Sequence, residues 1–188
     1  MIKQITNISN LQSIYSKVFK SNDPFSNAAQ DSLPMRVVIF PTRGYHLNEE
    51  QFTALAKTNT ILYGQNEFYV AQIEAKYPTG SFVDNWYWEC LNSTYVEYEK
   101  IPVNLEASIF SVDGTWGFLI SHENHALLGC TQEFWDEFKK QYPRWAEDYK
   151  EFIKYWRHWD NYRKQHMDKS AKNKWLSAFL DGLTVKPE

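Results

Sequence analysis

The stretch EASIFSVDGTWGFLISHENHALLGCTQEFWDEFKKQ, residues 106–141, decides the fold. Its first half predicts a strand at Glu106–Ser111, a tight turn at Asp113-Gly114 and a second strand at Trp116–Ser121. A third apolar run, Ala126–Cys130, follows a short polar link, and apolar side chains then recur three and four residues apart, as on one face of a helix. Three short antiparallel strands that lead into a helix indicate an α+β domain.

Further strands are predicted on the N-terminal side of this stretch. Gly64-Gln65-Asn66 predicts a hairpin turn between two of them. In the strand that follows this turn, Gln72 and Glu74 alternate with apolar residues, so we expect one of its faces to meet solvent. The predicted strands are Met35–Phe40, Thr60–Tyr63, Glu67–Ala75, Phe82–Leu91 and Thr94–Lys100.

Helical periodicity appears near the N-terminus, in the middle of the chain and after residue 142. These helices are expected at Asn10–Lys20 with Ser9 as its cap, from Asn48 to about Lys57 with an Asn48/Gln51 capping box, along a stripe from Trp145 to Arg163, and at Ser170–Leu180. We therefore predict one α+β domain over residues 1–188, with a sheet-rich part at 35–130 and a helical part at 131–181. The sheet should be mainly antiparallel, with five to seven strands, and packed with amphipathic helices.

Aromatic residues make up 17% of the chain, with eight Trp, twelve Tyr and twelve Phe. Each such side chain removes roughly 150–250 Å² from water when it is buried. Two interpretations follow: an aromatic-heavy core, or a surplus of rings that lies on the surface and meets a partner or ligand.

The net charge of −3 is unevenly distributed along the sequence. Residues 1–130 hold eight Lys/Arg and thirteen Asp/Glu, whereas residues 131–188 hold twelve and ten. The excess of acidic residues in 1–130 disfavours nucleic-acid binding by this part of the chain and favours a basic partner. In residues 131–188, lysines and arginines alternate with tryptophans, as they do in proteins that bind single-stranded nucleic acids. Acidic residues nearly cancel the positive charge there, so nucleic-acid binding is disfavoured for this part of the chain too.

Targeting, membrane and cofactor signals are not found in the sequence. The N-terminus lacks the apolar core of a signal peptide, and no apolar run approaches the ~20 residues that a membrane span needs. Two cysteines are too few for a secreted disulfide scaffold of this size. We expect a cytoplasmic protein with reduced thiols. No nucleotide loop, nucleophile elbow or cysteine-rich metal signature occurs, so no cofactor is predicted.

An acidic and aromatic cluster gives the candidate binding residues, which are Trp86, Trp88, Tyr95, Glu97 and Glu99. Aromatic side chains dominate the energetics of protein interfaces, and acids beside them steer a basic partner. The same composition also fits a solvated sheet face, or the paired acids and aromatic platforms of carbohydrate-cleaving sites.

A second group of residues, around the polar link at 122–125, offers chemistry instead of binding. His122 and His125 are three residues apart and flank Glu123, which fits the start of a zinc site, although such a site needs a third or fourth ligand. A Cys–His nucleophile pair is also possible, with Cys130 or Cys90 as the thiol and His125 or His46 as the base, and Cys130 is favoured because it precedes the predicted helix start. The alternative interpretations are two solvated imidazoles and a buried, inert thiol.

The run from Gly114 to Cys130, followed by Phe134 and Trp135 in a helix, resembles the end of the sheet in small bacterial immunity proteins of polymorphic and contact-dependent toxin systems. The likeness spans residues 114–138 and brings no catalytic residue with it. It implies a bacterial protein that binds and neutralises a partner. We therefore expect a cytoplasmic protein-binding module, an immunity protein for a basic toxin being the specific form. The alternative is a small hydrolase, zinc-dependent or not, that uses Cys130, His125 and Glu123.

Overall fold

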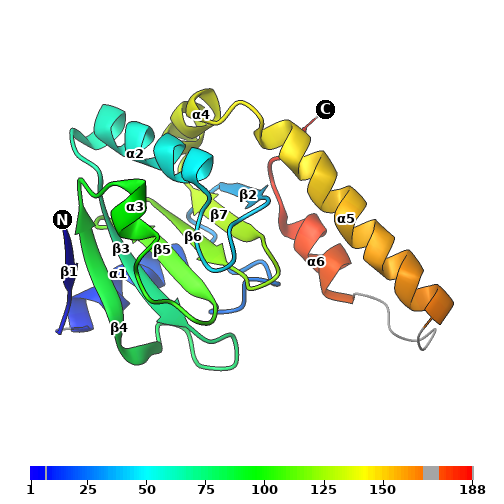
Figure 1. The fold of residues 1–188 in the computed structure, drawn as a ribbon, viewed down its shortest axis with the longest axis horizontal. Helices are drawn as coiled ribbons and strands as arrows, with labels where there is room; N and C mark the ends of the chain where they lie inside the picture. Colours follow the sequence, from blue (N-terminus) through cyan, green and yellow to red (C-terminus); the bar gives the residue numbers. More distant parts are fainter. Residues whose placement is uncertain (7, 167–173, 188) are drawn as a thin grey trace.

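The computed structural model describes residues 1–6, 8–166 and 174–187 and confirms the α+β fold with a mainly antiparallel sheet. Seven strands form one sheet in the order β1-β4-β3-β5-β6-β7-β2, and each pair of neighbours is antiparallel (Figure 1). The strands are β1 (Ile2–Gln4), β2 (Met35–Ile39), β3 (Glu67–Ile73), β4 (Phe82–Leu91), β5 (Ala107–Ser111), β6 (Trp116–Ile120) and β7 (Ala126–Cys130).

The meander β5-β6-β7 lies at the centre of the fold, as its sequence predicts. The turn between β5 and β6 is fixed by the hydroxyl of Ser111, which accepts hydrogen bonds from the backbone N–H of Gly114 at 3.0 Å and of Thr115 at 2.8 Å. Gly114 has a φ of +84°, a left-handed conformation that glycine adopts at little cost. All fifteen residues of the three strands are buried, so helices must cover both faces of the meander.

Helices cover both faces, and strand alternation divides the core between them. On one face, Phe118 belongs to an apolar cluster with residues of α2, α3 and α4. The next residue, Leu119, faces the opposite way and packs in a second cluster with residues of α1, α5 and α6. In Figure 1, α5 (orange) and α6 (red) lie beside one another near β2. The helices are α1 (Ser9–Val18), α2 (Glu49–Tyr63), α3 (Tyr95–Tyr98), α4 (Gln132–Gln141), α5 (Trp145–His166) and α6 (Lys174–Gly182).

The predicted strand Thr60–Tyr63 is wrong, because these residues form the last turn of α2. The Asn48/Gln51 capping box is present as predicted, but the helix runs on to Tyr63 and ends at Gly64, which has a φ of +80°. The predicted hairpin turn is therefore a helix C-terminus. The β-branched residues at its end favoured a strand, but Thr58 and Asn59 of this helix are buried, and the Asn59 Nδ2 donates to the Asn66 Oδ1 at 3.0 Å just before β3.

The predicted strand Thr94–Lys100 is also wrong. Thr94 caps the short helix α3, and its side chain and that of Glu97 form a reciprocal capping box. The alternation of apolar and acidic residues suggested a strand, yet the Thr-x-x-Glu spacing was the correct signal. The face expected to be wet at Gln72 is buried too, since this side chain is 4% exposed and its Oε1 accepts from the Asn104 N–H at 2.9 Å.

The other helix predictions need smaller changes. α1 begins at Ser9, but no side chain caps it. Part of the helix predicted at Ser170–Leu180 lies outside the described residues, and α6 runs from Lys174 to Gly182.

Beyond α6, the chain crosses the outer edge of β2. The carbonyl oxygen of Arg36 accepts from the N–H of Thr184 at 3.1 Å and of Val185 at 3.2 Å. The Thr184 hydroxyl accepts from the Arg36 N–H at 2.8 Å and donates to the Pro34 carbonyl oxygen at 2.7 Å. A segment distant in sequence thus satisfies the backbone N–H and carbonyl of Arg36 in an edge strand.

Candidate functional site

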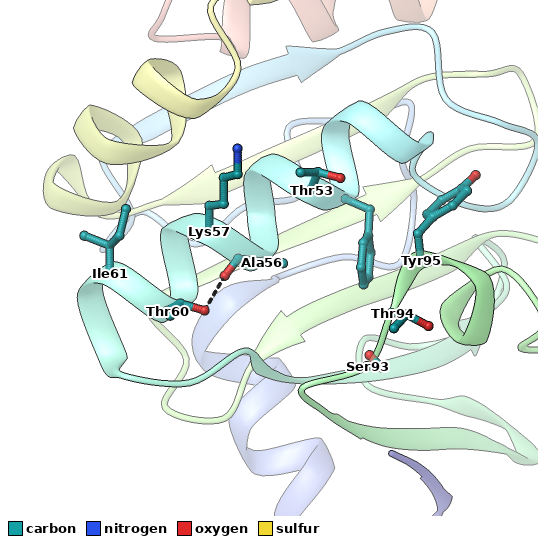
Figure 2. A pocket seen from close by; sticks show the side chains of 9 residues that line it. Thr53, Ala56, Lys57, Thr60, Ile61, Ser93, Thr94 and Tyr95 are labelled. Carbon is teal, nitrogen blue, oxygen red and sulfur yellow. Dashed lines mark hydrogen bonds between the residues drawn. The ribbon is translucent and has the colours of Figure 1, made fainter.

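An open apolar groove lies between α2 and the start of α3, with a volume of about 400 Å³ (Figure 2). One wall is the outer side of α2, and the other is the segment Ser93–Tyr95. We call it the α2–α3 groove. Its lining residues are Phe52, Thr53, Ala56, Lys57, Thr60, Ile61, Ser93, Thr94 and Tyr95.

Packing of α3 against α2 fixes the shape of the groove. Tyr98 stacks on Phe52 with ring centroids 4.7 Å apart and an interplanar angle of 20°. The Tyr98 hydroxyl accepts a hydrogen bond from the backbone N–H of Leu47 at 2.9 Å, just before α2 begins. Tyr95 packs against the same Phe52 ring at 5.8 Å, so its aromatic side chain stands at the end of the groove. These ring contacts and this hydrogen bond fix the position of α3 relative to α2.

Each of the two helices that form the groove exposes one large aliphatic side chain, and that of α2 belongs to the groove lining. Ile61 on α2 is 57% exposed and Val96 on α3 is 60% exposed. Lys57 is the cation among the lining residues, and Figure 2 shows its side chain extending from α2 away from Ser93, Thr94 and Tyr95. Exposed aliphatic side chains beside an apolar hollow are characteristic of interaction sites.

Of the five predicted binding residues, Tyr95, Glu97 and Glu99 lie on or beside α3. Tyr95 lines the groove, but both carboxylates have partners within the chain. Glu97 accepts from the Thr94 N–H at 2.8 Å, and this bond lowers the pKa of its carboxyl. Glu99 is 3.0 Å from the Arg43 guanidinium. The nearby Tyr95 hydroxyl and the charge of Glu99 raise the pKa of Arg43.

The two predicted tryptophans lie on β4 and face the same helices. Their rings are 6.2 Å apart, and both pack in the cluster under α2 and α3. Trp88 is only 8% exposed and therefore belongs to the core, whereas Trp86 is half-buried. Trp88 is thus available to a partner only to a small extent. Sequence reasoning missed the end of the α2 wall, at Thr60 and Ile61, because residues 60–63 were interpreted as a strand.

The polar link between β6 and β7 carries a solvent-accessible histidine–carboxylate pair. The Nδ1 of His122 is 2.8 Å from an Oε1 of Glu106, and its Nε2 is 3.8 Å from an Oε1 of Glu123. The His122 side chain is 49% exposed. Within the described ranges, no group of three or more His, Cys, Asp or Glu side chains is placed to hold a metal ion.

His125 and Cys130 lie on opposite faces of the sheet and do not form the predicted Cys–His pair. The His125 ring is fully buried on the α5–α6 face, where it stacks on Trp175 at 5.7 Å with an interplanar angle of 7°. Burial lowers its pKa to about 4. Cys130 is fully buried in the cluster under α2 and α4, and burial raises the pKa of its thiol. The thiol therefore has no adjacent imidazole base and little thiolate character.

None of the described helices has the length and apolar composition of a membrane span. Comparison of the chain with family models, with curated proteins and with solved structures finds no match.

Proposed function

We propose that this chain is a protein-binding module and that the α2–α3 groove is its docking site. The observation that carries the proposal is an open apolar hollow with an aromatic end wall and an exposed Ile61 in its lining, together with an exposed Val96 on the same short helix as Tyr95. Covering each of these aliphatic side chains would contribute roughly 1 kcal/mol to binding, since each is already partly buried. Such a groove suits an apolar anchor side chain from a partner.

The partner that fits best is a basic protein. Residues 1–130, which include both walls of the groove, carry five more acidic than basic side chains. This excess attracts a cationic surface and accelerates its association. The more specific proposal is an immunity protein that neutralises a basic toxin. It is supported by the resemblance of residues 114–138 to such proteins and by the excess of acidic side chains in residues 1–130.

The test uses a toxin encoded beside the gene for this chain, with binding measured by calorimetry. Ile61→Arg places a cation and a bulky polar group at the rim, so we expect at least a hundredfold loss of affinity. Leu105→Arg is the matched control, because Leu105 is an exposed aliphatic residue (39%) outside the groove. It should bind within about twofold of the wild type.

Three results would contradict the proposal: no neighbouring toxin binds, Ile61→Arg binds as the wild type does, or both variants weaken binding equally. Affinity should also fall as salt rises, because the attraction between an acidic module and a basic partner is screened. An affinity that does not change with salt concentration would contradict the proposal that the partner is basic. The proposal that a partner docks in the α2–α3 groove would still stand.

A further inference from the structure

A second hollow, on the side of the molecule formed by α5, is lined by several lysine and arginine side chains. It lies between α5 and the segment that follows α6 and has a volume of about 730 Å³. We call it the α5 basic cleft. It is distinct from the α2–α3 groove, since the two share no lining residue. The residues that line it are Tyr149, Lys150, Ile153, Lys154, Arg157, His158, Asn161, Leu180 and Lys186.

Helical spacing builds one wall of the cleft from two parallel rows on α5. One row steps by four residues through Tyr149, Ile153 and Arg157, and the adjacent row through Lys150, Lys154 and His158. Leu180 of α6 and Lys186 after it supply the opposite wall. The half-buried side chains of Tyr149, Ile153 and Leu180 pack against the core cluster and give the cleft an apolar floor.

The cations of the cleft are left almost without internal partners. Lys154 is 3.4 Å from Glu151, and both side chains are exposed. Within the described part of the chain, Lys150, Arg157 and Lys186 take part in no ion pair, and none of the residues that line the cleft is acidic. Like charges four residues apart on a helix repel one another, so an anion in the cleft would relieve this repulsion.

We infer that the α5 basic cleft binds an organic phosphate of nucleotide size. Lysine and arginine side chains are the groups that proteins use to bind phosphate oxygens, and Arg157 offers a planar fork for them. The apolar floor gives the organic part of the ligand a surface to pack on, with the Tyr149 ring as its aromatic element. Ligand pockets of 300–1,000 Å³ hold molecules of this size, and the cleft falls in that range.

Calorimetric titration of the full chain with ATP, without divalent metal, tests the inference. We expect saturable binding, and we expect ATP to bind at least fivefold more tightly than inorganic tripolyphosphate because only ATP reaches the apolar floor. The double variant Lys154→Ala/Arg157→Ala should weaken ATP binding tenfold or more. Lys57→Ala, which removes an exposed lysine from α2, should leave it unchanged, as should Ile61→Arg in the α2–α3 groove.

Absence of ATP binding would overturn the inference, as would an equal loss in Lys57→Ala and in the double variant. Equal affinities for ATP and tripolyphosphate would overturn its organic part. Binding of a single-stranded oligonucleotide without any binding of ATP would overturn it in favour of a nucleic-acid surface. Because the groove variant and the cleft variants are separate, failure here leaves the proposed docking function untouched.

Discussion

The imidazole of His125 is buried among aromatic rings from three parts of the chain. Phe25 lies 5.2 Å from it, Phe152 of α5 lies 5.4 Å from it and Phe179 of α6 lies 5.6 Å from it, all measured between ring centroids. Because its surroundings come from residues up to a hundred positions away, the local pattern could not show that it is a core residue. The same holds for Trp88, whose exposure depends on the helices that cover β4.

Protonation of His125 should destabilise the fold. Its pKa is lowered to about 4 in the folded state, against about 6.5 in the unfolded chain, so the unfolded state binds the proton more tightly. Stability is therefore fully present above about pH 6.5 and is lost as the pH falls toward 4, by about 3 kcal/mol for this group. Denaturant unfolding at a series of pH values measures this loss.

The matched variant for this measurement is His125→Phe, which keeps an aromatic ring and has no titrating group. Its stability should fall less steeply than that of the wild type between pH 6.5 and 4. Parallel profiles for the two proteins would show that the imidazole is not the group responsible. His122→Phe serves as a control for the neighbouring imidazole, which is half-exposed.

The elements predicted well are those whose own sequence shows a regular spacing of apolar residues and also a residue that marks where the element begins or ends. The β5-β6-β7 meander with its Asp113-Gly114 turn, the start of α4 just after Cys130 and the long helix α5 are examples. The end of α2 and the short α3 were missed, because β-branched residues and a two-residue alternation imitate a strand. Since these two elements form the walls of the α2–α3 groove, only Tyr95 of its lining was predicted.

The contact between α1 and the sheet depends on Gly117 of β6. A Cβ atom at this position would lie 2.7 Å from both the Val18 Cγ1 and the Phe19 Cζ, and these two side chains are fully buried. Gly117→Ala should therefore push α1 away from the sheet and lower the free energy of unfolding by about 1–3 kcal/mol. Denaturant titration followed by circular dichroism measures the change.

A second substitution checks that crowding is the cause. Phe19→Leu shortens one of the side chains in the way, so the loss in the double variant should be smaller than the sum of the two single losses. Strict additivity would mean that crowding against the Phe19 ring is not the cause of the loss.

At the scale of the whole molecule, the two free thiols report on global opening. Cys90 and Cys130 are fully buried, and both lie in the cluster between the sheet and helices α2–α4. Burial raises the pKa of Cys90 to about 12 and also raises that of Cys130. A thiol reagent should therefore modify neither cysteine quickly in the native protein, and both at once in concentrated guanidinium.

Labelling each cysteine alone, in Cys90→Ala and Cys130→Ala, sharpens this measurement. If the cluster opens as a unit, native-state labelling rates in the two variants should rise in step with denaturant. A thiol that reacts rapidly in the absence of denaturant would show that its part of the sheet opens locally, contrary to the packing described above.

The crossing of β2 by residues 184 and 185 also affects how copies of this chain meet one another. An uncovered outer strand is a template on which a second sheet can grow, and sheets joined in this way lead to fibrous aggregates. Here one flank is a strand of three residues, and at the other flank the carbonyl oxygen of Arg36 is already occupied from within the same polypeptide. Both edges of the sheet are therefore poor templates for strand pairing with a second copy of the chain.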